Sequence, residues 1–451
     1  RRPEGPRAEP FRLALSLSPR GLTMQALLPY STHAAARALV LGVGFTALTA
    51  CDRSRDATES VESSAVSAAV TDSAAAPAAD FKSVAAKVVQ QSAAVREGEI
   101  VLISGTDEDL PLLEDIAIEV QKAGGYPLVT VNTEQFRRRT YDEVPAKYDA
   151  RTPSLARKLI EIEDVFITTE SGEGRTMKGV PPARMAARAK AFAPVLELAR
   201  KRNVRTVALG NGLYPSAERA EQFGMSREEL GRLMYGGIDA DYSQLQATGE
   251  QVRKALSAGK ELHITNPAGT DLRVGIAGRP VQVSDGVISP EDRKRGGAAL
   301  SVWLPAGEVY LTPVPGTANG VIVADHLFYQ GDRIEGLRFE VKDGKLVGMT
   351  AKSGLDPLQE FYQLAGPGKD VFGVVDIGIN PGIELPEGGA VNVWSRAGAV
   401  TVVLGDNTWA GGDNQVNFAV SPEIGNATVE VDGTPLVKDG KLVAGTAVAG
   451  R

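Results

Sequence analysis

Residues 99–258 alternate between short apolar runs and longer stretches whose apolar residues recur at helical spacing. The apolar runs fall at 100–103, 127–131, 165–169 and 204–209. The stretches with helical spacing fall at 110–123, 156–163, 182–202, 225–235 and 242–258. Strands that alternate with helices of roughly 10–20 residues build βαβ units, in which the strands run parallel. The pattern therefore predicts an α/β domain around a parallel sheet.

The pattern changes near residue 260, where short apolar runs are separated by Asp-Gly, Asn-Pro and Pro-Gly turns. The expected strands are 261–265, 271–276, 308–312, 319–324, 335–341 and 345–350. Asp343-Gly344 favours a tight hairpin, because these two residues readily adopt the positive φ angles that such a turn needs. We expect an N-terminal parallel-sheet α/β domain at 81–259, followed by a β-rich antiparallel α+β domain at 260–451.

The segment before residue 81 has the features of an export signal and a tether. An apolar run at 38–50 follows Arg37 and ends in Leu48-Thr49-Ala50-Cys51, which contains the single cysteine of the chain. This ending resembles the lipobox of bacterial lipoproteins, and the run is too short to span a bilayer, which takes about 20 residues. We therefore expect lipidation at Cys51 and a place in the cell envelope. Residues 1–50 are then an upstream extension plus signal peptide, with Met24 as the natural start, and 51–80 a flexible tether.

The charge of the chain excludes some partners. Residues 1–50 carry six Arg and two Glu, so the rest of the chain has a net charge of −11, against −7 for the whole. An acidic chain does not suit nucleic acid, which needs a concentrated basic face. It does not suit electrostatic adhesion to anionic lipid either, so we expect membrane contact through the lipid alone.

Common catalytic motifs are mostly absent. The turn after the first strand, Ser104 to Asp109, is acidic and lacks the glycines of a phosphate-binding loop. There is no Gly-x-Ser-x-Gly nucleophile motif. Outside the signal segment only His263 and His326 remain, which is too few for a His-rich zinc site but still permits a site of oxygen ligands.

Several segments resemble, in order, those of the thermophilic metallo-aminopeptidases of the aminopeptidase T, aminopeptidase S and PepS type. The most specific is Leu304 to Pro313, which resembles a Pro-x-Gly-Glu-Val-x-x-x-Pro motif. The others are Asn266–Leu272, Tyr329–Leu337, Asp343–Val347, Gly378–Gly382, Gly411–Asn414 and Val429–Gly433. The resemblance covers roughly residues 98–445. It implies a peptidase with a dinuclear site of divalent metal ions in the C-terminal domain, and a homodimer.

The metal ligands that this resemblance implies are mostly missing at the matched positions. Of two Glu, two His, one Tyr and one Asp, only the first Glu is present, as Glu308. The Tyr position falls at Thr408 or Trp409. The remaining four ligand positions hold Val374, Thr401, Ala419 and Ser421.

A replacement site of carboxylates is one interpretation of this C-terminal region. Asp376 stands two residues after Val374, which is the same face of a strand. Glu308, Asp376 and Asp413, with Asp406 and His326 as further candidates, would form an oxygen-rich cluster, with Glu308 as the catalytic residue. The alternative is that the aspartates are turn residues of β-hairpins.

Two functions remain open from the sequence, besides a purely structural role as an envelope lipoprotein, which the sequence favours less. The first is an envelope lipoprotein that removes N-terminal residues from peptides with Zn, Co, Mn or Mg in a modified site. The second is a catalytically inactive relative that binds a peptide or a partner protein and needs no metal.

Overall fold

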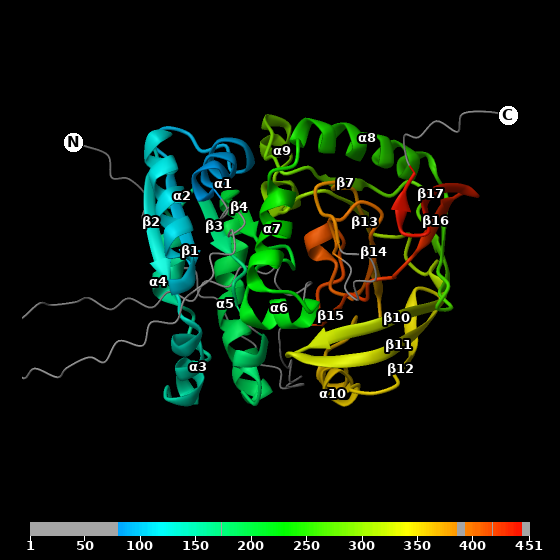
Figure 1. Ribbon diagram of the computed structural model, residues 1–451. Helices are drawn as coiled ribbons and strands as arrows, with labels where there is room; N and C mark the ends of the chain where they lie inside the picture. The colour runs from blue at the N-terminus through cyan, green and yellow to red at the C-terminus, as the bar shows by residue number, and fades with distance from the viewer. Residues whose placement is uncertain (1–79, 173, 386–392, 417, 444–451) are drawn as a thin grey trace, which may run out of the picture.

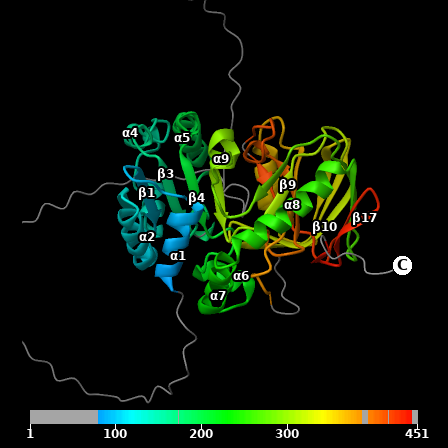
Figure 2. The same ribbon diagram turned by 90° about the horizontal axis from the view of Figure 1, so that it is seen from above.

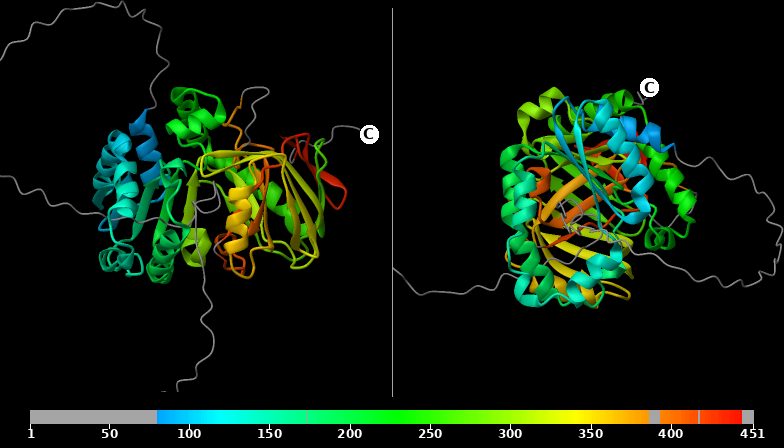
Figure 3. Two further views of the ribbon diagram at one scale, coloured as in Figure 1. Left: turned by 90° about the horizontal axis from the view of Figure 1, so that it is seen from below. Right: turned by 90° about the vertical axis from the view of Figure 1, so that its left-hand side faces the viewer.

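The computed structural model describes residues 80–172, 174–385, 393–416 and 418–443. A parallel-sheet α/β unit and a β-rich antiparallel unit lie side by side (Figures 1 and 3). The expected fold class is confirmed. The predicted signal segment, the lipobox at Cys51 and the tether up to residue 79 lie outside the described residues. No helix in the described ranges is long and apolar enough to cross a membrane.

The α/β unit is built on five parallel strands. Their order is β2 (Tyr126–Val131), β1 (Ile100–Gly105), β3 (Val165–Thr169), β4 (Arg205–Leu209) and β8 (Ser301–Leu304). Each neighbouring pair is parallel. The first four strands match the apolar runs of the sequence. The fifth comes from beyond residue 260, so the α/β unit includes a strand from the second half of the chain.

Helices cover both faces of the parallel sheet because side chains along a strand alternate between its faces. Val101 and Ile103 pack with α1 (Phe81–Lys87) and α2 (Leu110–Lys122) on one face. Leu102 and Phe166 pack on the other face with α4 (Ser154–Ile160) and α5 (Pro182–Arg202). Figure 2 shows the sheet between these two layers. The remaining helices are α3 (Glu134–Asp142), α6 (Ala217–Phe223), α7 (Arg227–Ile238), α8 (Tyr242–Ala258), α9 (Pro290–Arg295) and α10 (Asp356–Leu364).

The β-rich unit contains two antiparallel sheets. The larger runs β12 (Lys345–Thr350), β11 (Asp332–Lys342), β10 (Asn319–Tyr329), β6 (Asp271–Gly275), β5 (Glu261–Thr265), β16 (Thr428–Val431), β17 (Thr434–Lys438) and β18 (Lys441–Leu442). The smaller runs β15 (Ala419–Val420), β14 (Val400–Gly405), β13 (Phe372–Gly378), β9 (Glu308–Leu311) and β7 (Val281–Ser284). Asp343-Gly344 joins β11 to β12 with both φ angles positive, which confirms the predicted hairpin.

The smaller sheet has two chemically different faces. Val309, Val375, Ile377 and Val402 belong to the main hydrophobic core. The alternate residues of the same strands, among them Glu308, Tyr310, Asp376 and Thr401, are on the opposite face by the period of two. We call this second face the polar face. Because β8 of the parallel sheet leads through three residues into β9, the polar face begins where the two units join.

Candidate ligand-binding site

The carboxyl ends of the parallel strands are tied together by the buried carboxylate of Asp109. Its Oδ2 accepts hydrogen bonds from the Thr106 amide at 2.7 Å, Thr169 Oγ1 at 2.6 Å and Ser171 Oγ at 2.8 Å. It also accepts from the Thr106 hydroxyl, and its Oδ1 accepts from the hydroxyl of Tyr214. Ligands of open α/β sheets bind outside the carboxyl ends of the strands. This cluster therefore shapes the edge of the sheet at which a ligand is expected.

Glu308 lies at the same edge and is fully buried. The Asn211 side chain, which follows β4, donates from Nδ2 to Glu308 Oε1 at 2.8 Å and to the carbonyl of Pro305 at 2.9 Å. Asn211 has a φ of +44°, which is uncommon for a residue other than glycine. Asn211 of the α/β unit thus holds the carboxylate of Glu308, which is the first residue of strand β9 in the β-rich unit.

Asp376 is also fully buried and lies on the polar face. Strand register places it directly between Tyr310 of β9 and Thr401 of β14. Gly378, two residues further along β13, pairs with Glu308. The two carboxylates therefore share one face and are offset by two residues along adjacent strands.

Four further positions at which the family resemblance implies metal ligands hold residues that bind metals poorly. Val374 and Ala419 are buried in an apolar cluster with Tyr310 and Trp394. Thr401 is 1% exposed and Ser421 is 3% exposed, and neither hydroxyl has a hydrogen-bond partner among the residues described. Neutral hydroxyls and aliphatic side chains are poor substitutes for imidazoles and carboxylates.

The three tryptophans of the chain gather beside this face. Trp409 is half-buried, and its ring centroid lies 5.3 Å from that of Tyr310 and 6.2 Å from those of Trp303 and Trp394. Trp303 comes from β8 and Tyr310 from β9, so the cluster bridges the two units. We call these four residues the aromatic cluster.

The other candidate metal ligands lie in turns or on strands of the β-rich unit. The Asp406 carboxylate accepts hydrogen bonds from the backbone and hydroxyl of Thr408 and from the backbone of Val416, which is the role of a turn residue. Burial raises the pKa of Asp406. Asp413 is exposed in the turn that follows. His263 contacts Asp271 at 2.8 Å, and His326 packs edge-on against Phe328 on β10.

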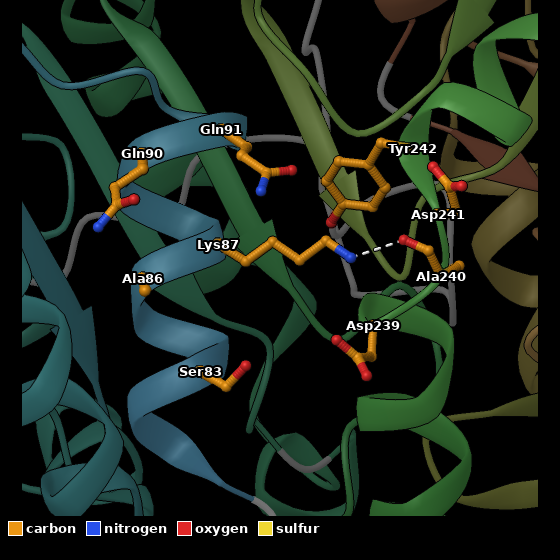
Figure 4. Close-up of a pocket in the computed structure, with 9 residues that line it drawn as sticks. All are labelled: Ser83, Ala86, Lys87, Gln90, Gln91, Asp239, Ala240, Asp241 and Tyr242. Carbon is orange, nitrogen blue, oxygen red and sulfur yellow. Dashed lines mark hydrogen bonds between the residues drawn. The ribbon is translucent and has the colours of Figure 1, made fainter.

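A polar hollow of about 390 Å³ lies elsewhere, between α1 and the junction of α7 with α8 (Figure 4). Lys87 crosses it, donating to the carbonyl of Ala240 at 2.6 Å with its ammonium 4.1 Å from the centre of the Tyr242 ring. Burial lowers the pKa of Lys87. These contacts tie α1 to the start of α8, so we interpret the hollow as part of a helix junction.

Comparison with known proteins identifies the family. A family model described as thermophilic metalloprotease (M29) matches residues 78–366, which is more than half of the chain. The chain belongs to this family. It is 26% identical over 296 residues to aminopeptidase PepS of Streptococcus thermophilus, a match that spans 58% of this chain and 67% of that protein. The family resemblance inferred from the sequence is therefore confirmed.

Two solved structures share the fold of this M29 protein. AmpT from Thermus thermophilus has a TM-score of 0.62 at 20% identity, covering 80% of this chain and 98% of that one. The 2,5-dihydroxypyridine dioxygenase of Pseudomonas putida KT2440 has a TM-score of 0.52 at 15% identity, covering 81% and 97%. Because the second protein is named for a different reaction, the fold by itself does not decide the chemistry.

The family name implies a divalent metal, and the residues present do not fit one. Within the described ranges, no group of three or more His, Cys, Asp or Glu side chains could hold a metal ion. Glu308, Asp376 and Asp413 do not form such a group among the described residues, so a metal site at these three residues stays a prediction. A dinuclear site also needs ligands that clamp two ions close together, and Val374 and Ala419 supply none.

Sequence reasoning missed several residues around this face. Glu423 pairs with Thr401 by an isolated antiparallel bridge. Burial lowers the pKa of Arg396 and of Arg219, and the nearby charge of Glu423 partly opposes this shift in both. No motif marks these residues. In the sequence they appear only as single charged residues near apolar segments. That pattern is too common to indicate a functional site.

Proposed function

We propose that this M29 protein is an aminopeptidase-like, peptide-binding lipoprotein of the cell envelope that does not hydrolyse its ligand. The observation that supports this most directly is which residues stand at the positions where the family has its metal ligands. Val374 and Ala419 pack into an apolar cluster, and Thr401 and Ser421 supply only hydroxyls. An apolar cluster cannot acidify a water or polarise a peptide carbonyl, which the metal pair does in a metallopeptidase.

Peptides remain the best-supported ligand class. The related protein is named aminopeptidase PepS, and the family is one of metalloproteases. The polar face lies at the carboxyl edge of the parallel sheet, the usual place for a ligand in this class of fold.

The competing proposal is a divergent aminopeptidase with a modified metal site and Glu308 as the catalytic residue. It is favoured by one observation, which is that Glu308 and Asp376 are both fully buried on the same face. Zn, Co, Mn or Mg would be the candidate ions.

Turnover assays on the full chain separate the two proposals. We expect no release of leucine or alanine from leucyl and alanyl substrates with Zn, Co, Mn or Mg added, at enzyme concentrations where PepS is active. Peptide binding should persist under the same conditions. Turnover that requires one of these ions and disappears in Glu308→Gln would establish the competing proposal instead.

The envelope location is a second part of the proposal, supported by the sequence Leu48-Thr49-Ala50-Cys51. Lipidation at Cys51 would place the folded units outside the cytoplasm. We expect Cys51→Ser to move the protein from the membrane fraction to the soluble fraction, with Thr49→Ser as a matched control that stays in the membrane fraction. If the Cys51→Ser protein remained with membranes, lipid anchoring at this residue would be wrong. A homodimer is proposed from the family resemblance alone.

A further inference from the structure

We propose that the outer surface of α4, α5 and α9 binds the surface of an anionic phospholipid membrane. The inference rests on the proposed envelope location for the presence of a membrane, and it gives the folded units a membrane contact of their own besides the lipid. The net charge of −11 beyond residue 50 predicts no electrostatic adhesion to lipid, but the structure distributes that charge unevenly.

The two helical layers that cover the parallel sheet carry opposite charge (Figure 2). Helix α5 contains six basic residues and one carboxylate, Glu197. On the other face of the sheet, residues 107–122, which include α2, contain six carboxylates and one basic residue, Lys122. Exposed charges act over about 10 Å at 0.1 M salt, so a surface responds to the charge that faces it rather than to the net charge.

The cations of the α5 layer form one continuous exposed surface. Helices α4 and α5 pack on each other through Ile160 and Val195. The ends of α5 and α9 are adjacent, because a methyl group added at Gly296 would lie 3.0 Å from the side-chain oxygen of Asn203. We call the exposed cations of this surface the basic face: Lys158 of α4, Lys190, Arg200 and Lys201 of α5, and Lys294 and Arg295 of α9.

Carboxylates on the same surface offset only part of this charge. With Arg157, which pairs with Glu161 at 3.5 Å, the surface has seven cations against four carboxylates, an excess of three positive charges. In the part of the chain that the structure describes, no carboxylate lies within ion-pair distance of Lys158 or Lys190. The four carboxylates are Glu161, Glu197, Glu291 and Asp292.

Two exposed aliphatic side chains lie beside these cations. Leu155 on α4 is 41% exposed, and Ile162, just after α4, is 53% exposed. Basic residues next to exposed apolar ones are typical of surfaces that lie at the boundary between lipid headgroups and acyl chains. Nucleic acid offers phosphates to the cations but no apolar layer to the side chains beside them. The surface therefore favours anionic lipid over nucleic acid.

The length of chain before the fold is compatible with this orientation. Helix α1, the first of the fold, packs on the opposite face of the parallel sheet from α4 and α5. Residues 52–79 number 28, a length that reaches up to roughly 90 Å when fully extended. An α/β unit of this size is only about 40 Å across. Lipidation at Cys51 and contact through the basic face can therefore occur together.

Vesicle binding tests the basic face without the lipid anchor. The chain from Asp52 onward keeps every residue that the structure describes and lacks both the apolar run at 38–50 and Cys51. It is mixed with vesicles of phosphatidylcholine alone or of phosphatidylcholine with phosphatidylglycerol, and the bound protein is measured by sedimentation. We expect binding only to the vesicles that contain phosphatidylglycerol, and its loss in high salt. Equal binding to both kinds of vesicle, or to neither, would overturn the inference.

Paired substitutions locate the contact. Each basic residue near an anionic surface contributes about fivefold in affinity, so Lys158→Gln with Lys201→Gln should bind the anionic vesicles roughly twentyfold more weakly. Lys82→Gln with Lys122→Gln removes the same charge from the opposite layer and should change the affinity by no more than about twofold. All four side chains are exposed, so both pairs should fold. Equal loss of affinity in the two double variants would overturn the role of the basic face.

Ile162→Ser separates lipid from nucleic acid. It should weaken binding to the anionic vesicles several-fold, because a hydroxyl replaces the aliphatic side chain that enters the headgroup region. A DNA duplex of mixed sequence should bind more weakly than the anionic vesicles under the same conditions. Tighter binding of the duplex, together with unchanged vesicle affinity in Ile162→Ser, would identify nucleic acid as the partner and overturn the membrane.

These results are distinguishable from a failure of the proposed function. Absence of vesicle binding by residues 52–451 would overturn the basic face and leave lipidation at Cys51 and peptide binding intact. A high-salt wash of the membrane fraction in the Cys51→Ser test keeps the two contacts apart, because salt releases protein held by charge and leaves lipidated protein in place. Cys51→Ser protein that survives this wash would refute the anchor alone.

Discussion

Asp109→Ala is expected to lower the free energy of unfolding by about 3–5 kcal/mol, because several buried donors lose their acceptor and each unsatisfied group costs about 1–3 kcal/mol. The carboxylate is 4% exposed and accepts hydrogen bonds from residues that follow three different parallel strands. Its removal would leave the buried hydroxyls of Thr169, Ser171 and Tyr214 without their acceptor. Urea unfolding followed by far-UV circular dichroism measures the loss.

Two variants calibrate that result. Asp107→Ala removes an exposed carboxylate from the same turn and should change stability by no more than about 0.5 kcal/mol. Tyr214→Phe removes one donor and should cost about 1–3 kcal/mol. Burial and the nearby carboxylate raise the pKa of the Tyr214 phenol well above its usual value, so it remains a donor throughout the experimental range. Equal stability of the Asp109 and Asp107 variants would show that the cluster contributes nothing.

Stability is expected to fall with rising pH because of Glu163. This carboxyl group is 2% exposed between α4 and β3, and neither oxygen has a hydrogen-bond partner among the residues described. Burial raises its pKa from 4.5 to about 7, partly offset by Arg202. A group whose folded pKa is raised stabilises the fold fully below its unfolded pKa and loses that contribution as the pH rises through the folded value. The loss between pH 4.5 and 8 is about 3 kcal/mol.

Glu163→Gln tests this effect because glutamine has nearly the same shape and does not titrate. The unfolding free energy of the variant should rise by about 2.5 kcal/mol relative to that of the parent protein on going from pH 5 to pH 8. Glu161→Gln, an exposed change two residues away, should show no such trend. A constant difference between Glu163→Gln and the parent at both pH values would contradict the assignment.

The sequence predicts the α/β unit well because its strands are local apolar runs between helical periods. Strand β8 was missed, since Ser301–Leu304 is short and its place in the sheet depends on pairing with Thr206–Leu209, far away in the chain. The hairpin at Asp343-Gly344 was predicted because its turn chemistry is local.

The candidate site was only partly predictable. The period of two places Asp376 on the same strand face as Val374, and the structure has it there. Asp413 was grouped with these carboxylates because of its sequence position, but it is exposed in a turn. The aromatic cluster could not be predicted, because Trp303, Trp394 and Trp409 come from segments that only tertiary packing brings together.

We propose that this M29 protein keeps the family fold without a competent metal site. The most direct test is the metal content of the full chain after incubation with zinc and removal of unbound ions, measured by plasma emission spectroscopy. We expect well under one ion per chain, with no difference between the parent protein and Glu308→Gln. One or two tightly bound ions per chain, lost in Glu308→Gln, would show instead that the protein has a metal site.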